Sequence, residues 1–143
     1  MKKSVATLIS AVVAGAVLAG CGGDDPYCAA IEENRAALDD FGQTRTDAAY
    51  AKYAKAARSV ATTAPDKVKD DWAKLGAVTD GVVKAHKSAD IALEDMADAA
   101  KVDQLDADDL ASLNKAYEKF NDTAAQRKSV VSSAKDTCKI TLK

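Results

Sequence analysis

The sequence has few residues of the kinds that mark common functional sites. Aromatic side chains make up 5% of its 143 residues, and there is one histidine. A single imidazole excludes sites that need two, and with them most catalytic zinc sites. Basic residues do not outnumber acidic ones, since 20 Lys and Arg stand against 22 Asp and Glu. Nucleic-acid-binding domains normally carry a basic stripe, so the composition indicates no such partner.

Motifs that would signal a cofactor or a catalytic nucleophile are also missing. The chain contains no phosphate-binding glycine loop, no nucleophile elbow and no metalloprotease motif. We therefore expect no cofactor and no bound metal. The hydrophobic fraction of 48% overstates the core, because much of it is alanine. A chain of this length suits one ordinary domain.

The first twenty residues differ in composition from the rest of the chain. Lys2 and Lys3 precede an apolar run from Val5 to Leu18, and small residues then lead to Cys21. This order is typical of a secretory signal peptide. The apolar run is shorter than the roughly 20 residues of a spanning helix, so a permanent membrane span is the weaker alternative.

The segment Leu18-Ala19-Gly20-Cys21 resembles the lipobox of bacterial lipoproteins. The resemblance implies lipid transfer to the Cys21 thiol, cleavage before Cys21 and acylation of the new amino group, with palmitate as an expected chain. It implies an extracytoplasmic protein anchored to the cell membrane through Cys21. The alternative is a secreted protein in which Cys21 merely follows the signal. The chain then divides into a signal peptide (1–20), a lipidated tether (21–25) and a helical domain (26–143).

Lipid attachment would hold the protein at the membrane without help from its charge. Each buried methylene contributes about 0.8 kcal/mol, so two or three acyl chains bind almost permanently. Cleavage before Cys21 removes Lys2 and Lys3 and no acidic residue, so the mature chain is more acidic than the whole, whose net charge is −2. Such a domain is not attracted to anionic head groups, and we expect it to stand off the membrane surface.

If Cys21 carries lipid, Cys28 and Cys138 remain as an even pair in an exported protein. An oxidising compartment makes a disulfide the default for such a pair. The closed loop of about 110 residues would contribute roughly 4–5 kcal/mol in the chain-entropy treatment. That contribution is comparable with the whole stability of a small domain.

The hydrophobic periodicity predicts an all-α fold, because no stretch alternates like a strand. The first helix is expected to begin at Asp25-Pro26, with Asp as cap and Pro at the first position, and to close at Gly42. Its apolar face comprises Cys28, Ile31, Leu38 and Phe41. Thr46 should cap a second helix, which Pro65 ends. The apolar side of that second helix comprises Tyr50, Tyr53, Ala57, Val60 and Ala61.

A third helix after Pro65 shows the clearest pattern. Its expected seam has a heptad-like spacing and comprises Val68, Trp72, Leu75, Thr79, Val82 and His86. Between Lys87 and Asp106 the pattern weakens and indicates short helical pieces. Two glycines inside the third helix, Gly76 and Gly81, cost about 1 kcal/mol each relative to Ala. They indicate either a close helix contact or a kink.

Asp106 should cap a final helix of about thirty residues, with Asp109 near the positive helix end. Its expected apolar stripe is Leu110, Leu113, Tyr117, Phe120, Ala124, Val131, Ala134 and Cys138. The prediction is an antiparallel up-and-down bundle of about four helices. In that topology the first helix starts where the last one stops, so Cys28 and Cys138 meet. The topology and the disulfide therefore support one another.

Four sets of residues are candidates for chemistry. His86 could be a general base or a ligand, although a core histidine with one hydrogen bond is the simpler interpretation. The acidic stretch Asp103, Asp106, Asp108 and Asp109 lacks the central glycine and downstream Glu of an EF-hand, and helix capping accounts for most of it. Glu94, Asp95 and Asp98 are most simply a solvated face. A candidate ligand pocket between the helices comprises Trp72, Tyr50, Tyr53, Tyr117 and Phe120, which could equally be ordinary core.

The mature region resembles in composition the small, Ala- and Asp-rich helical lipoproteins of actinobacteria, a resemblance that assigns no functional residue. The leading hypothesis is a membrane-anchored module that binds an envelope protein or ligand and has no catalytic activity. One alternative is a carrier of an apolar small molecule or lipid within the bundle. The other is an enzyme with a site near His86. A carrier requires a sizeable apolar cavity around Trp72, whereas an enzyme requires converging polar groups.

Overall fold

The structure is a computed structural model that describes residues 25–143. The expected signal peptide, Cys21 and nearly all of the expected tether lie outside the described residues. Within 25–143 the chain forms six α-helices, one 3₁₀ helix and no strand, which confirms the all-α prediction. The elements are α1 (Pro26–Asp39), α2 (Asp47–Thr63), α3 (Asp66–Ser88), η1 (Leu93–Ala97), α4 (Ala99–Val102), α5 (Ala107–Asn121) and α6 (Ala124–Cys138).

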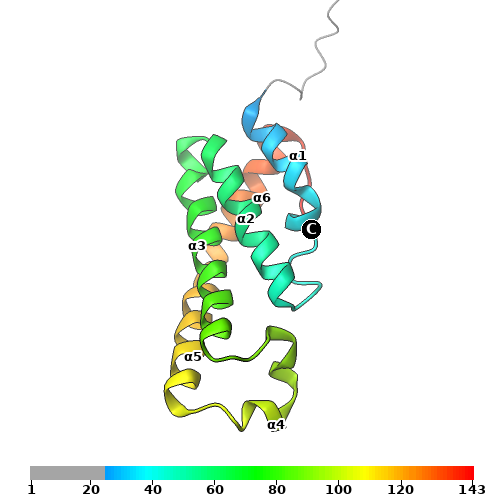
Figure 1. The fold of residues 1–143 in the computed structure, drawn as a ribbon. Helices are drawn as coiled ribbons and strands as arrows, with labels where there is room; N and C mark the ends of the chain where they lie inside the picture. The colour runs from blue at the N-terminus through cyan, green and yellow to red at the C-terminus, as the bar shows by residue number, and fades with distance from the viewer. Residues whose placement is uncertain (1–24) are drawn as a thin grey trace, which may run out of the picture.

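Helix α3 is the longest element and packs against more helices than α1 does. It packs against α2, α5 and α6, while α1 packs against α2 and α6. Figure 1 shows α1, α2, α3 and the α5–α6 pair running alternately down and up. The start of α1 and the end of α6 lie at one end of the domain, and the segment with α4 lies at the other. One end of the domain therefore holds the first turn of α1 and the last turn of α6, and the other end holds the segment with α4.

The helix boundaries follow the local signals in the sequence. The Asp25 carboxylate accepts a hydrogen bond from the Tyr27 amide (2.9 Å), and Pro26 occupies the first position of α1. Thr46 Oγ1 accepts from the Ala49 amide (3.2 Å) at the start of α2. Asp106 accepts from the Asp109 amide (2.8 Å) at the start of α5. These caps satisfy amide groups that have no partner within the helix, as predicted.

The third helix buries the whole seam that its spacing predicts. The six seam residues are all buried, with Val82, Thr79 and His86 fully so. Gly76 explains how closely α2 approaches, because a Cβ there would lie 2.8 Å from Arg58 Cγ and 3.1 Å from the Ala54 carbonyl oxygen. The segment after α3 forms only η1 and α4, which confirms the expectation of short helical pieces.

The prediction of one final helix of about thirty residues is wrong, because the helix breaks between Asn121 and Ala124. The fully buried Thr123 donates from Oγ1 to the Phe120 carbonyl (2.6 Å). Arg127 bridges the break by donating to Thr123 Oγ1 (2.8 Å) and to the same carbonyl (3.4 Å). A threonine hydroxyl that competes for a backbone carbonyl disfavours a continuous helix at this point.

The break changes which residues of the last segment face the core. Ala124 and Val131 were expected in the apolar stripe, yet both are exposed, Val131 to 39%. Thr123 and Val130 are buried instead. Leu110, at the start of the expected stripe, is also 37% exposed. Beyond the break, only Ala134 and the partly buried Cys138 of the expected stripe remain against the core.

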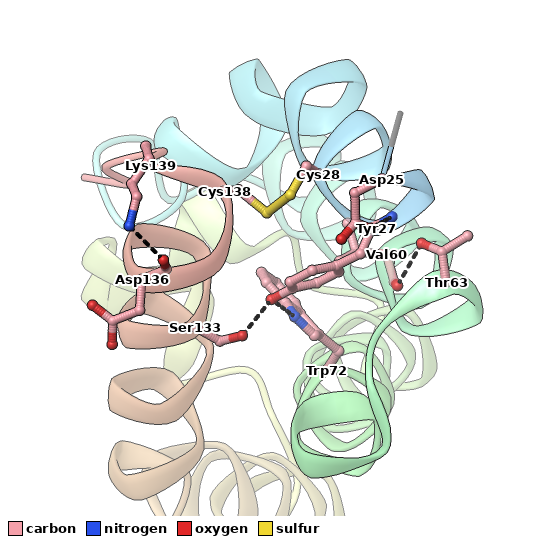
Figure 2. The surroundings of a disulfide bond; sticks show 10 residues. All are labelled: Asp25, Tyr27, Cys28, Val60, Thr63, Trp72, Ser133, Asp136, Cys138 and Lys139. Atoms are coloured by element: carbon pink, nitrogen blue, oxygen red, sulfur yellow. Dashed lines mark hydrogen bonds between the residues drawn. A yellow bond between two sulfur atoms is a disulfide. The ribbon is translucent and has the colours of Figure 1, made fainter. Parts of the chain in front are cut away.

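The expected disulfide is present at the end of the domain where α1 begins. Cys28 is bonded to Cys138, with 5.2 Å between their Cα atoms and a sequence separation of 110 residues. The bond joins the first turn of α1 to the last turn of α6 (Figure 2). The cross-link therefore encloses almost the whole domain.

Candidate functional site

The buried core beneath the disulfide contains a chain of polar side chains. Trp72 donates from its indole Nε1 to the Tyr27 hydroxyl (3.1 Å), and that hydroxyl donates to Ser133 Oγ (3.1 Å). Figure 2 shows the three side chains side by side below the sulfur atoms. Trp72 and Tyr27 are each only 1% exposed. The network joins α3, α1 and α6, so it positions Trp72 as a structural side chain.

Sequence reasoning missed Tyr27 and Ser133 as partners of Trp72. Tyr27 directly follows the helix-starting Pro26, and its place beside Cys28 was the available signal. A buried tyrosine or tryptophan normally finds a hydrogen-bond partner for its polar atom. Which partner it finds depends on the packing of three helices, and no local pattern specifies that.

A small cavity lies beside Trp72 and contains two of the five candidate pocket residues. Its volume is about 70 Å³, and Trp72 and Tyr53 form part of its wall. The other lining residues are Leu38, Phe41, Arg127, Val130, Val131, Leu142 and Lys143. Tyr50, Tyr117 and Phe120, the remaining candidates, do not line it. The structure thus divides the predicted set between this cavity and an adjoining aromatic cluster, and Phe41 and Tyr53 belong to both.

That second group is an aromatic cluster centred on Phe41. The Phe41 ring stacks on Tyr53 with 3.7 Å between centroids, and lies 5.3 Å from Tyr50 and 5.8 Å from Phe120. The Arg127 guanidinium lies 5.4 Å from the centre of the Phe120 ring. These contacts fill the space between α1, α2 and α5, so the aromatics act there as core.

The cavity is lined by the buried Tyr53 hydroxyl and by two cationic residues, Arg127 and Lys143. Burial raises the pKa of Tyr53 to about 12, against a smaller lowering by the nearby Arg127 charge. Tyr53 is therefore a neutral hydroxyl over the physiological range. Arg127 and Lys143 add positive charge to an otherwise apolar lining. Pockets for small ligands are usually about 300–1,000 Å³, so this cavity has room for only a few atoms.

His86 uses both of its ring nitrogens inside the fold. The side chain is fully buried, with Nδ1 3.0 Å from the Ile91 carbonyl oxygen and Nε2 2.7 Å from the Tyr117 hydroxyl. A carbonyl only accepts, so Nδ1 carries a proton and donates to it, while Nε2 shares a hydrogen bond with the Tyr117 hydroxyl. Burial is also the main cause that raises the pKa of Tyr117. The imidazole connects α3, the following segment and α5.

A polar groove of about 520 Å³ adjoins His86, with Asp47, Asp90 and Asp95 in its lining. Asp47 and Asp95, and the neighbouring Glu94, have structural partners. Asp47 accepts from the Leu93 amide (3.3 Å), and Glu94 accepts from the Asp47 amide (3.2 Å). Asp95 pairs with Lys101 at 2.7 Å, an exposed pair that raises the pKa of Lys101 mainly through this hydrogen bond.

The other acidic candidates cap helices or lie on the surface. Asp98 accepts from the Ala100 amide at the start of α4 (3.0 Å), and Asp106 caps α5 as described above. Asp103 and Asp108 are exposed. In residues 25–143 no group of three or more His, Cys, Asp or Glu side chains is placed to hold a metal ion.

Comparisons with protein-family models, curated proteins and solved structures found no match for this chain. Among the residues that the structure describes, no helix combines the length and apolar character that crossing a membrane requires.

Proposed function

We propose that this chain is a bacterial lipoprotein anchored on the outer face of the cell membrane through Cys21, with a helical domain that binds an envelope component. Residues 1–20 act as the signal peptide and residues 21–25 as the lipidated tether. The lipobox-like segment Leu18-Ala19-Gly20-Cys21 supports the anchoring half of the proposal. The domain is an antiparallel bundle of about four helical segments, in which α5 and α6 together form the fourth.

The proposed binding role rests on the burial and the hydrogen bonds of His86. A general base must reach a substrate proton, and this imidazole is fully buried with both nitrogens in hydrogen bonds. A metal ligand would need a free nitrogen, and both are engaged. His86 thus supports a structural role, and with it a protein that acts by binding rather than by catalysis.

The carrier alternative depends on the cavity beside Trp72. Its volume of about 70 Å³ is well below the roughly 300 Å³ at the lower end of small-ligand pockets. Holding a lipid chain there would require displacement of side chains that now pack on Trp72. The small volume favours the interaction module over the carrier.

Detergent–water phase partitioning of full-length protein tests the anchor. Wild type should enter the detergent phase and Cys21→Ser the aqueous phase. The double variant Cys28→Ser/Cys138→Ser keeps Cys21 and is the matched control, because it should partition like wild type. Equal partitioning of wild type and Cys21→Ser would overturn the lipoprotein proposal.

Crosslinking on intact cells, followed by identification of captured molecules, tests the binding role. His86→Gln should capture the same molecules as wild type, since His86 takes no part in contacts with a partner. Turnover of a substrate by purified protein, abolished in His86→Gln, would instead favour the enzyme alternative. Saturable quenching of Trp72 fluorescence by an apolar ligand, with lipid released beyond the anchor, would favour the carrier.

A further inference from the structure

A groove between α3 and α5 is lined by lysines in an otherwise acidic protein. Its volume is about 310 Å³, and Lys84 from α3 faces Lys115 and Lys119 from α5 across it. Ser88 and Ser112 are the other polar side chains of the lining. Figure 1 shows α5 running alongside the second half of α3, at the end of the domain opposite the disulfide. We call this feature the lysine groove.

The charge of the lysine groove is of one sign. All of its ionisable lining residues are lysines, whereas the whole chain has a net charge of −2. Lys84 is paired with Asp80 at 2.8 Å one turn earlier. Lys115 and Lys119 form no salt bridge with the described residues. Two ammonium groups without a salt bridge to the described residues, and a third that is paired with Asp80, therefore line one open groove.

The floor of the lysine groove contains a glycine that packing does not explain. A Cβ built at Gly81 meets nothing within 4 Å, whereas one at Gly76 would collide with α2. Glycine inside a helix costs about 1 kcal/mol relative to alanine, so Gly81 weakens α3 without a contact that requires it. The other floor residues are Ala85 and Ala116. Such a floor lets a ligand approach the backbone closely.

We propose that the lysine groove binds an extended chain of phosphate groups. Lysine binds phosphate as a point charge, and a phosphate chain carries negative charge at every unit, so three lysines along one groove can pair with the same chain. The serine hydroxyls add donors for phosphate oxygens. Lysine is depleted at the cores of protein–protein interfaces, whereas three of the eight residues that line this groove are lysines. The occupant is a thin polyanion such as a phosphodiester or polyphosphate chain.

This inference gives a ligand class to the binding role proposed above, and rests on that role for the source of the ligand. With the anchor at Cys21, the tether joins the domain at Asp25, at the end away from the lysine groove. Head groups of the protein's own membrane are then distant, and a soluble or envelope-bound phosphate chain is the favoured source.

Calorimetric titration of the full chain in detergent micelles at low salt tests the proposal. The probes are inorganic phosphate, a linear polyphosphate, polyglutamate and vesicles containing phosphatidylglycerol. Polyphosphate should bind, and Lys115→Gln/Lys119→Gln should weaken it on the order of tenfold, since each close charge pair contributes a few-fold in water. In a plot of the logarithm of the binding constant against the logarithm of the salt concentration, the magnitude of the slope should also decrease by about one for each lysine removed.

Two further variants separate the site from general electrostatics. Lys67→Gln/Lys69→Gln removes the same charge from exposed positions at the start of α3 and should bind like wild type. Gly81→Leu fills the floor without changing charge and should weaken binding, while circular dichroism reports its fold. Vesicle binding that depends on Lys115 and Lys119 would assign the phosphate to a lipid, and polyphosphate binding alone would assign it to a soluble chain.

Three results would overturn the proposal. The first is that polyglutamate binds as tightly as polyphosphate, which would favour an acidic protein as the partner. The second is that polyphosphate binds both groove variants as tightly as wild type. The third is that no phosphate probe binds. Each of them leaves the partitioning of Cys21→Ser unaffected. Failure of the groove and failure of the anchor are therefore distinguishable.

Discussion

The Trp72 indole donates to the Tyr27 hydroxyl across 3.1 Å of buried core, directly below the Cys28–Cys138 bond. Tyr27 is both acceptor and donor, because its hydroxyl proton goes to Ser133. The network links residues 45 and 106 positions apart in the chain. Loss of the Tyr27 hydroxyl oxygen should therefore weaken contacts among α1, α3 and α6.

Tyr27→Phe should lower the free energy of unfolding by about 1–3 kcal/mol, because it leaves the buried Trp72 N–H without an acceptor. Ser133→Ala is the matched control, since it removes only the outer acceptor and should cost less. Urea unfolding followed by Trp72 fluorescence measures both. A Tyr27→Phe protein as stable as wild type would contradict a structural role for this bond.

The disulfide should contribute a large part of the domain's stability. Reduction, or the double variant Cys28→Ser/Cys138→Ser, should lower the free energy of unfolding by roughly 2–5 kcal/mol, because the cross-link restricts the unfolded chain. Thiol titration of the exported protein gives an independent check. Two titratable thiols in protein whose Cys21 is lipidated would show that Cys28 and Cys138 are not oxidised.

Tyr53 should make the domain sensitive to alkali. Burial raises its pKa from 10.0 to about 12, so the folded protein holds the proton more tightly than the unfolded chain does. The stability that Tyr53 contributes is complete below pH 10 and is lost as the pH rises to about 12. Tyr53→Phe should flatten the decline of unfolding free energy between these values. If the unfolding free energies of wild type and Tyr53→Phe fell in parallel with pH, Tyr53 would not be the source of the alkaline sensitivity.

Loss of His86 should loosen the segment after α3 without affecting a catalytic step. His86→Gln should destabilise the domain by about 1–3 kcal/mol, because at least one of the two buried hydrogen bonds is lost. Tyr117→Phe removes only the Nε2 contact and should cost less. Hydrogen exchange should accelerate mainly in residues 89–106. Uniform acceleration along the whole chain would argue against this local role.

The two glycines of α3 should respond to alanine with opposite signs. Gly76→Ala places a Cβ 2.8 Å from Arg58 Cγ and should destabilise by about 1–3 kcal/mol. Gly81→Ala meets no atom within 4 Å and should stabilise by about 0.4–1 kcal/mol. Thermal unfolding of both variants provides the measurement. A loss of stability in Gly81→Ala would mean that this glycine serves the fold itself.

Sequence reasoning predicted where α1, α2, α3 and α5 begin, because each start depends on a few neighbouring residues, whereas α1 ends at Asp39 and not at the expected Gly42. Asp25, Thr46 and Asp106 cap amides two or three residues later, and Pro65 ends one helix and precedes the next. Such signals are local, so a pattern in the chain is enough to find them. The pairing of Cys28 with Cys138 followed from their number and from the expected topology.

The break at Thr123 and the placement of the aromatics could not be predicted in the same way. Threonine is common inside helices, and it interrupts this one because it is buried and Arg127 holds the freed carbonyl. Phe41 was expected only as a face residue of the first helix, yet it stacks on Tyr53. Both outcomes depend on how separate helices meet, which a one-dimensional periodicity does not contain.

The position of the disulfide also determines how the domain responds to a pulling force. A load applied at Asp25 meets the covalent bond at Cys28 after three residues and passes directly to the end of α6. A load applied between Asp25 and Lys143, both outside the loop, cannot draw out the roughly 110 residues of the closed loop, although they would extend to several hundred ångströms if free. A ligand held between α3 and α5 would load the same closed loop. Because such a ligand would pull from within the loop, the arm that begins at Cys28 and the arm that ends at Cys138 would share the load, and neither arm could be drawn out unless the other unfolded as well.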